Sequence, residues 1–244
     1  MNMLTSYLNE IRRLLDQIES TQSQAIEKAT MAVADALQKG GTVYAFGTGH
    51  SHMLAEELFY RAGGLVKVYP ILDEPLMLHV GGSRSSQLER LSGYAETLFD
   101  HGISPNEKDV VFIFSNSGRN AVPIETAALM KERGVPTVCI TNVKHSSGCT
   151  SRHSSGKRLF ELCDVVIDNC GRVGDSAMEI GEYTCGPTST VIGVAILQSI
   201  ACGAVEELQQ RGVKPEVFLS GNVDGGDVVN QQYIDKYNKQ IPML

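Results

Sequence analysis

Two short segments rich in glycine and hydroxyl side chains are the parts of this sequence best suited to chemistry. Residues 47–51 (GTGHS, the first loop) and 115–120 (SNSGRN, the second loop) each follow an apolar run and precede a segment of helical composition. A strand that turns into a helix in this way points backbone N–H groups and the positive end of the helix dipole outward, and this arrangement binds phosphate. Neither loop carries the lysine of a nucleotide P-loop. Together they predict a phosphorylated sugar as ligand.

A dinucleotide is the alternative ligand for the first loop. Gly47 and Gly49 match the start of the G-x-G-x-x-G pattern, but His52 stands where the third glycine belongs. Asp73 follows the second predicted strand, near the place of a ribose-binding acid. This reading leaves the second loop unexplained, so we favour the phosphosugar.

Composition excludes several other classes of function. A net charge of -7 over 244 residues argues against a nucleic-acid-binding surface. No apolar run approaches a membrane span and no signal-peptide pattern is present, so we expect a cytoplasmic protein without membrane contact. The six cysteines lack a CxxC motif and predict reduced thiols. Ligands at the spacing of His50 and His52 suit a strand better than a helix start, and no Cys or carboxylate set completes a site, so we expect no metal and no other cofactor.

The first 39 residues predict a helix with one narrow apolar seam. Its members step by four and three and are Leu4, Leu8, Ile11, Leu15, Ile18, Gln22, Ala25, Ala29, Ala32 and Ala36. The polar cluster at 20–23 is a candidate break into two helices. The seam packs either on the helix's own domain or on a second subunit, and the latter would make a homodimer or homotetramer.

After residue 41 strands and helices alternate. The predicted strands are 42–46, 65–72, 109–114, 136–141 and 164–168, and the predicted helices are 51–62, 84–101, 121–133 and 187–211. Continuous apolar strands indicate a parallel sheet covered by helices on both faces. We expect an α/β fold, a doubly wound five-stranded parallel sheet, in one domain spanning 1–244. Its parts are a helical segment (1–39), an α/β core (40–211) and a tail (212–244).

Three polar segments do not fit the alternation: 73–86, 142–158 and the tail from residue 221, which ends in a short polar helix. Loops of this length are usually binding lids or interface arms, and tolerated surface insertions are the alternative. We expect them near the carboxyl edge of the sheet, where ligands bind in open α/β folds.

These motifs together resemble the sugar isomerase (SIS) domain family. The resemblance rests on the two loops at their strand ends and on residues 186–190 (GPTST), which open a long apolar helix, and it covers about residues 40–210. It implies a five-stranded parallel three-layer α/β/α sandwich that binds phosphosugars. Family members include ketose–aldose isomerases, a lactyl-ether lyase and sugar-phosphate sensors. The residues after 142 and the tail resemble a bacterial subgroup named for phosphoheptose isomerase or for sugar isomerase.

The resemblance also implies a set of phosphate-binding residues. The set is Gly49, Ser51, Ser115, Ser117, Gly118 and Asn120. Asn120 stands where the family usually has Thr or Ser, although its amide can still donate a hydrogen bond. Thr188 and Ser189 are candidates for the sugar side of the site, and an ordinary helix N-cap is the alternative.

Isomerisation through an enediol needs a base that moves a proton between adjacent carbons. Glu57 lies in a segment, 55–58, that resembles the base-bearing helix of phosphoheptose isomerases, although about one turn closer to the loop; a solvated or subunit-facing acid is the alternative. Those isomerases also carry a histidine near the start of the last helix, which is missing here. His79 is our preferred substitute, and His50 and Glu182 are further candidates near the sugar.

We therefore expect an oligomeric phosphosugar enzyme, an aldose–ketose isomerase of a hexose or heptose phosphate. Two alternatives remain open. One is a lyase (etherase) or deaminase of an amino-sugar phosphate, and the other is a non-catalytic sugar-phosphate sensor.

Overall fold

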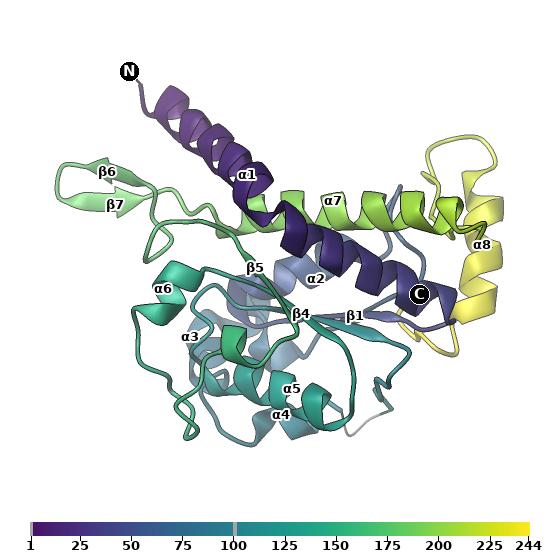
Figure 1. The fold of residues 1–244 in the computed structure, drawn as a ribbon, viewed down its shortest axis with the longest axis horizontal. Helices are drawn as coiled ribbons and strands as arrows, with labels where there is room; N and C mark the ends of the chain where they lie inside the picture. Colours follow the sequence, from purple (N-terminus) through teal and green to yellow (C-terminus); the bar gives the residue numbers. More distant parts are fainter. Residues whose placement is uncertain (1, 100–101) are drawn as a thin grey trace.

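A parallel five-stranded sheet lies at the centre of the structure, a computed structural model that describes residues 2–99 and 102–244 (Figure 1). Its strands are β1 (Val43–Gly47), β2 (Val68–Ile71), β3 (Val110–Phe114), β4 (Thr137–Thr141) and β5 (Val165–Asp168). Their order is β2-β1-β3-β4-β5, and every pair is parallel. The predicted doubly wound α/β class is confirmed, with strand bounds that differ from the prediction by at most three residues.

Helices cover both faces of this sheet (Figure 1). They are α1 (Met3–Gln38), α2 (His52–Leu58), α3 (Leu78–Leu88), α4 (Tyr94–Thr97), α5 (Ala121–Glu132), α6 (Val143–Ser147), α7 (Ser189–Gln210) and α8 (Gly226–Tyr237). Three 3-10 turns, η1 (Gly49–Ser51), η2 (Glu74–Leu76) and η3 (Leu159–Glu161), and a hairpin of β6 (Met178–Ile180) and β7 (Tyr183–Cys185) complete the described elements.

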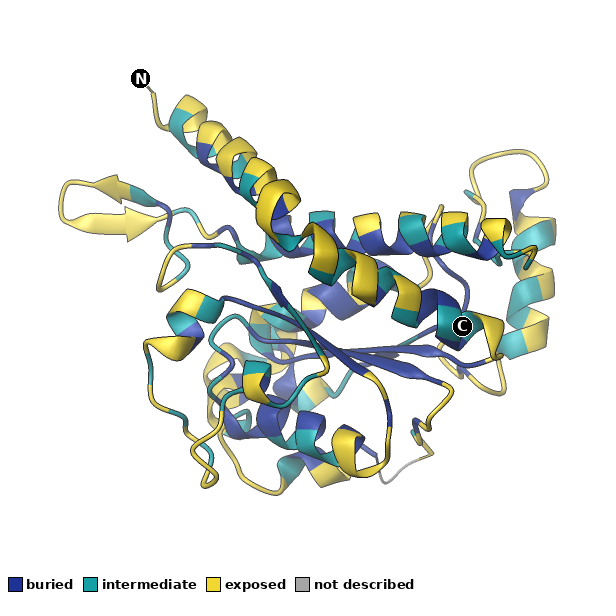
Figure 2. Cartoon of the chain, in the orientation of Figure 1, coloured by how far each residue is buried: buried dark blue, intermediate teal, exposed yellow. Residues whose placement is uncertain are grey.

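The sheet divides the core into two layers because successive strand side chains point to opposite faces. Phe112 and Phe114 pack with α1, α2 and α7, whereas Phe46 and Ile113 pack with α4 and α5. Strands β1, β3 and β4 are buried along their whole length (Figure 2). A rigid, buried sheet therefore fixes the ends of the strands from which both loops start.

Helix α1 is continuous, so the candidate break at 20–23 is wrong. The hydroxyls of Ser20 and Thr21 donate to carbonyls of the preceding turn, which satisfies them without interrupting the helix. The predicted seam is only partly covered within the molecule: its members Ile18 and Ala29 are buried, whereas Leu15 is 39% exposed. In Figure 1 the first half of α1 extends beyond the sheet, beside the hairpin.

The prediction of a polar loop over 73–86 is wrong. This segment forms η2 and most of α3, with a kink at Gly81. Ser85 is buried and donates to the carbonyl of Leu76 at 2.6 Å, so tertiary contacts outweigh the weak helix propensity of glycine and serine.

Other helix bounds also differ. The predicted helix 84–101 is divided between the end of α3 and α4, and its residues 100–101 lie outside the described residues. The helix predicted at 51–62 ends at Leu58. The hairpin of β6 and β7 has no counterpart in the prediction, because its two strands have three residues each and are exposed or half-buried.

Helix α7 is long and apolar enough to cross a membrane by length and composition, which corrects the expectation that no apolar run approaches a span. In this structure 44% of the apolar 18-residue stretch of α7 is buried, and the helix packs against α1 and α2. A core helix of a globular protein has the same properties.

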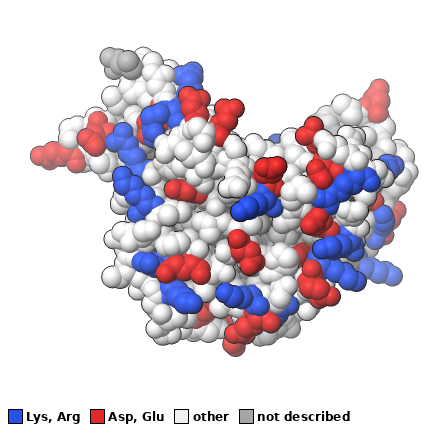
Figure 3. Space-filling model, in the orientation of Figure 1, with Lys and Arg blue, Asp and Glu red and all other residues white. Residues whose placement is uncertain are grey.

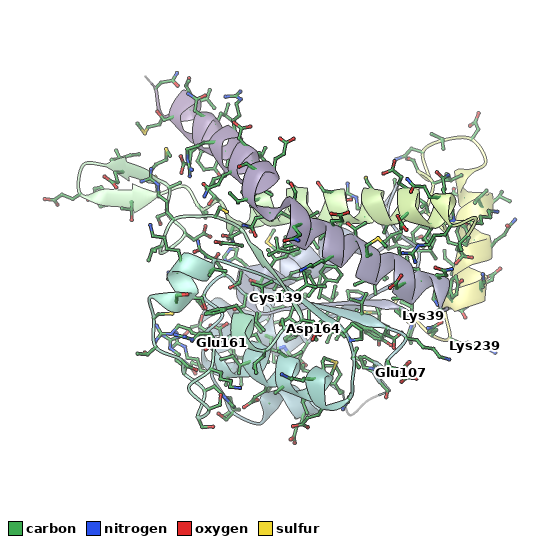
Figure 4. All side chains as sticks on the ribbon, in the orientation of Figure 1. Lys39, Glu107, Cys139, Glu161, Asp164 and Lys239 are labelled. Atoms are coloured by element: carbon green, nitrogen blue, oxygen red, sulfur yellow. The ribbon has the colours of Figure 1, made fainter. Side chains whose placement is uncertain are left out.

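The outer surface mixes charges of both signs. On the face drawn in Figure 3 basic and acidic side chains are interspersed. Lys39, Glu107 and Lys239 lie near one another at the end of the molecule where α1 ends and β1 begins (Figure 4). That end is opposite the edge at which the two loops emerge.

Candidate functional site

The two loops meet at the point where the strand order reverses. The first loop follows β1 and the second follows β3, and these strands pair directly from Val43 with Val110 to Gly47 with Phe114. From β1 the chain crosses to β2 on one side, while β3 leads to β4 and β5 on the other. Ligands of open α/β sheets bind in the crevice at such a switch point.

A narrow hollow of about 20 Å³ lies at this crevice. It is lined by His50, Ser51, Leu54, Phe114, Ser115, Asn116, Ile140, Asn169, Ser189 and Thr190. The structure thus brings His50, Ser51, Ser115 and Ser189 of the predicted set together. The hydroxyl, amide and imidazole groups among these residues can all hydrogen-bond to phosphate or sugar oxygens.

The first loop is held tightly at its base. Thr48 is buried and donates to a carboxylate oxygen of Glu89 at 2.8 Å, and Gly49 adopts a φ of +55°. The ring of His52 is buried against the carbonyl of Gly49, a structural position. Among the described residues no group of three metal-ligating side chains comes together.

The second loop needs a glycine at position 118. Gly118 has a φ of +56°, and a Cβ there would lie 2.8 Å from the hydroxyl of Ser146 and 3.2 Å from that of Thr141. Its N–H donates to the Ser115 hydroxyl at 3.2 Å. Ser115 is therefore oriented within the loop, whereas Ser117 is half-buried and lies outside the lining of the hollow.

Amide side chains tie the neighbouring strand ends to the second loop. Asn169, after β5, donates to the side-chain oxygen of Asn116 at 2.8 Å and accepts from the N–H of Gly171. The backbone of Asn142, after β4, donates to the carbonyl of Asn116 at 3.0 Å. Asn169 was not among our candidates, since its partner lies 53 residues away in sequence.

The start of α7 is capped by a residue that the sequence analysis did not identify. Asp175, with a φ of +57°, accepts from the backbone N–H groups of Thr188 and Ser189 at 3.0 Å and from the Ser189 hydroxyl. Thr188 is buried and stands at the N-cap position without capping the helix through its side chain. Of these two candidates, only Ser189 lines the hollow.

The polar segment 142–158 contacts the second loop at the carboxyl edge, as expected, whereas the tail lies at the opposite edge, where Gln240 donates to the Thr42 hydroxyl just before β1. The backbone N–H of Arg152 donates to the carbonyl of Arg119, and its guanidinium donates to the Asn120 side-chain oxygen, both at 2.8 Å. Burial, together with the charges of Arg90 and Arg119, lowers the pKa of Arg152. Asn120 is buried and faces this arginine.

The three acid–base candidates outside the loops do not line the hollow. Glu57 is half-buried on α2, paired with Arg61 and accepting from Gln198 of α7 at 3.3 Å. His79 is exposed on α3, a helix that contacts η1. Glu182 lies in the turn of the hairpin, which projects away from the sheet (Figure 1).

Comparison with known families gives one matching model. A model described as "SIS domain" matches residues 6–142. A UPF0309 protein of Halalkalibacterium halodurans is 44% identical over 245 residues, covering 99% of this chain and 97% of that protein.

Solved structures show the same fold at low sequence identity. A phosphoheptose isomerase from Francisella tularensis is 18% identical with a TM-score of 0.52, covering 86% of this chain and all of that one. A phosphoheptose isomerase from Neisseria gonorrhoeae is 16% identical with a TM-score of 0.51, covering 85% of this chain and 97% of that one.

The two loop glycines offer a matched test of this geometry. Gly49→Ala meets no atom within 4 Å and should cost only the strain of a positive φ, about 1–2 kcal/mol. Gly118→Ala meets the Ser146 hydroxyl as well and should cost about 1–3 kcal/mol more. Urea unfolding of both variants measures the difference, and equal losses would show that the second loop is not packed as described.

Proposed function

The chain belongs to the SIS domain family, and from this premise we propose that it binds a phosphorylated sugar between the first and second loops. The observation that carries the proposal is the placement of two hydroxyl-bearing helix starts on adjacent strands at the switch point of the sheet. A phosphate there is held from two sides, and the hollow beside it offers polar groups for the sugar.

The assigned roles follow the positions of the side chains. Ser51 and Ser115 line the hollow and are the direct phosphate ligands, with Ser117 beside them. The backbone at Gly49 and Gly118 comes close to the phosphate, because a side chain is disfavoured at both positive φ values.

We further propose that the bound sugar, a hexose or heptose phosphate, undergoes aldose–ketose isomerisation. The fold shared with a phosphoheptose isomerase is consistent with this class of reaction. Glu57 and His79 are the proposed acid–base groups, and both must move toward the hollow or act on a substrate that extends beyond it. His50 is the titratable side chain already in the lining.

Binding is the first prediction. Sugar phosphates should raise the melting temperature of the purified protein, because a ligand of the folded state stabilises it by mass action. Ser51→Ala and Ser115→Ala should each weaken binding about 10- to 100-fold, the value of a hydrogen bond to a charged group. Ser199→Ala, on the exposed side of α7, is the control.

The screen should include amino and N-acetyl sugar phosphates and nicotinamide nucleotides. Stabilisation by nicotinamide nucleotides alone would contradict the proposal and support the dinucleotide alternative for the first loop.

Turnover is the second prediction. Isomerisation in D2O should place solvent deuterium on the carbon next to the carbonyl, which NMR detects. Glu57→Gln should lower kcat about 100-fold or more, as expected for loss of a general base. The neighbouring Glu56→Gln is the matched control because its carboxylate is exposed. His79→Gln and His50→Gln, assayed in parallel, identify the second acid–base group.

Other products would distinguish the alternatives. Release of lactate or ammonia would indicate ether cleavage or deamination, and saturable binding without turnover would indicate a sensor.

We also propose that the chain forms one domain and assembles as a homodimer or homotetramer in the cytoplasm. Both α1 and the tail pack on the α/β core: Leu14 is fully buried, and Val217 of the tail bridges to Leu65. The six cysteines are unpaired, as is usual in a reducing compartment. Leu4 and Leu8 are 67% and 42% exposed on the projecting part of α1, and a second subunit would cover them.

The oligomer prediction tests that apolar surface. The double variant Leu4→Gln, Leu8→Gln should lower the mass measured by light scattering after gel filtration while the fold is retained by circular dichroism. Lys28→Gln, exposed on the same helix, should leave the mass unchanged. An unchanged mass in the double variant would locate the interface elsewhere.

A further inference from the structure

Residues 148–158, between α6 and η3 (the insertion, because they interrupt the alternation of strands and helices), and the adjoining Leu159 are attached to the second loop by four hydrogen bonds. Two of them come from Arg152 and reach Arg119 and Asn120, as described above. In addition, the Arg119 guanidinium donates to the Thr150 hydroxyl at 3.1 Å, and the N–H of Leu159 donates to the carbonyl of Gly118 at 2.9 Å. The insertion therefore places its side chains beside the start of α5.

Three arginines gather at this point without carboxylate partners. No carboxylate among the described residues forms an ion pair with Arg90, Arg119 or Arg152. Glu89 is the acid whose charge acts on Arg152, and it already accepts a hydrogen bond from Thr48. Three guanidinium charges and one carboxylate leave a net charge of +2, which matches a phosphomonoester dianion.

A buried donor in this cluster has no acceptor. The Nε atom of Arg119 is inaccessible to water and makes no hydrogen bond, and in the described part of the chain only the Ser146 hydroxyl shares this state. Because this nitrogen is also shielded from solvent, it adds an uncompensated positive partial charge to the cluster but does not itself contact an anion that enters from solvent.

The contact between Arg152 and Asn120 also fixes the orientation of the asparagine side-chain amide. A guanidinium can only donate, so the amide atom that faces it must be the oxygen. The amide nitrogen of Asn120 is then left as a donor at the N-cap of α5. An amide oriented by arginine thus takes the place of the Thr or Ser hydroxyl that the family resemblance implies at this position.

We infer that Arg152, oriented on Asn120 and supported by Arg119 and Arg90, is a binding residue for the phosphate group and makes this an arginine-based site for a phosphomonoester dianion. The inference rests on the proposed function for the identity of the ligand, but the anion site itself can be tested without a sugar. Arginine suits this role because its planar fork binds two phosphate oxygens at once.

Calorimetric titration with inorganic phosphate tests the site. Wild-type protein should bind phosphate, and Arg152→Gln should weaken binding about 10- to 100-fold, as expected for charge-assisted hydrogen bonds. Arg152→Lys should be intermediate because it keeps the charge and loses the fork. Lys131→Gln, exposed near the other end of α5, removes the same charge and should have no effect.

The possible outcomes distinguish a failure of this inference from a failure of the proposed function. Equal phosphate affinity in wild type and Arg152→Gln, or no binding of phosphate by wild type, would overturn the role of Arg152. If sugar phosphates still bound and depended on Ser51, the proposed function would stand. If phosphate bound through Arg152 while no sugar phosphate bound, the anion site would stand and the phosphosugar function would be wrong. Circular dichroism of each variant establishes that it is folded.

Discussion

The parallel pairing of β1 with β3 is the constraint on which the site depends. Because these strands are in register to their last residues, both loops leave the sheet at the same height and side by side. The chain then departs in opposite directions, toward β2 and toward β4, and open α/β sheets have a crevice at such a switch point. The two layers of buried side chains hold this pairing rigid, and the groups of the candidate site are therefore held in fixed positions as well.

The sequence was sufficient for the parts of the fold that depend on local patterns. Runs of β-branched and aromatic residues predicted all five parallel strands, and turns such as GTGHS predicted where a helix follows a strand. The prediction failed at α3, where glycine and serine favour a loop locally. There the buried Ser85 and its bond to the carbonyl of Leu76 decide the conformation, and such a contact leaves no trace in periodicity.

The parts of the candidate site that lie in local motifs were also predictable from the sequence. Ser51, Ser115 and Gly118 lie in motifs with a local mechanism, and the structure places them at the predicted edge. Asp175 and Asn169 form hydrogen bonds with residues 13 or more positions away in sequence. Only the folded chain therefore shows that Asp175 orients the start of α7 and that Asn169 orients the second loop. Glu57 is a case in which local spacing was not sufficient. Its position on the helix predicted a place near the first loop, but its side chain does not line the hollow.

The insertion that carries Arg152 shows how an irregular segment is kept in place. Between α6 and η3 it has no regular structure, so its order depends on side chains such as Ser151, whose hydroxyl donates to the carbonyl of Lys157 at 2.7 Å. Ordering such a segment costs about 1–2 kcal/mol of backbone entropy per residue, and bonds to the second loop offset part of that cost. A phosphate bound by Arg152 would add to them. In that case ligand binding and the order of this segment would be thermodynamically linked, and each would strengthen the other.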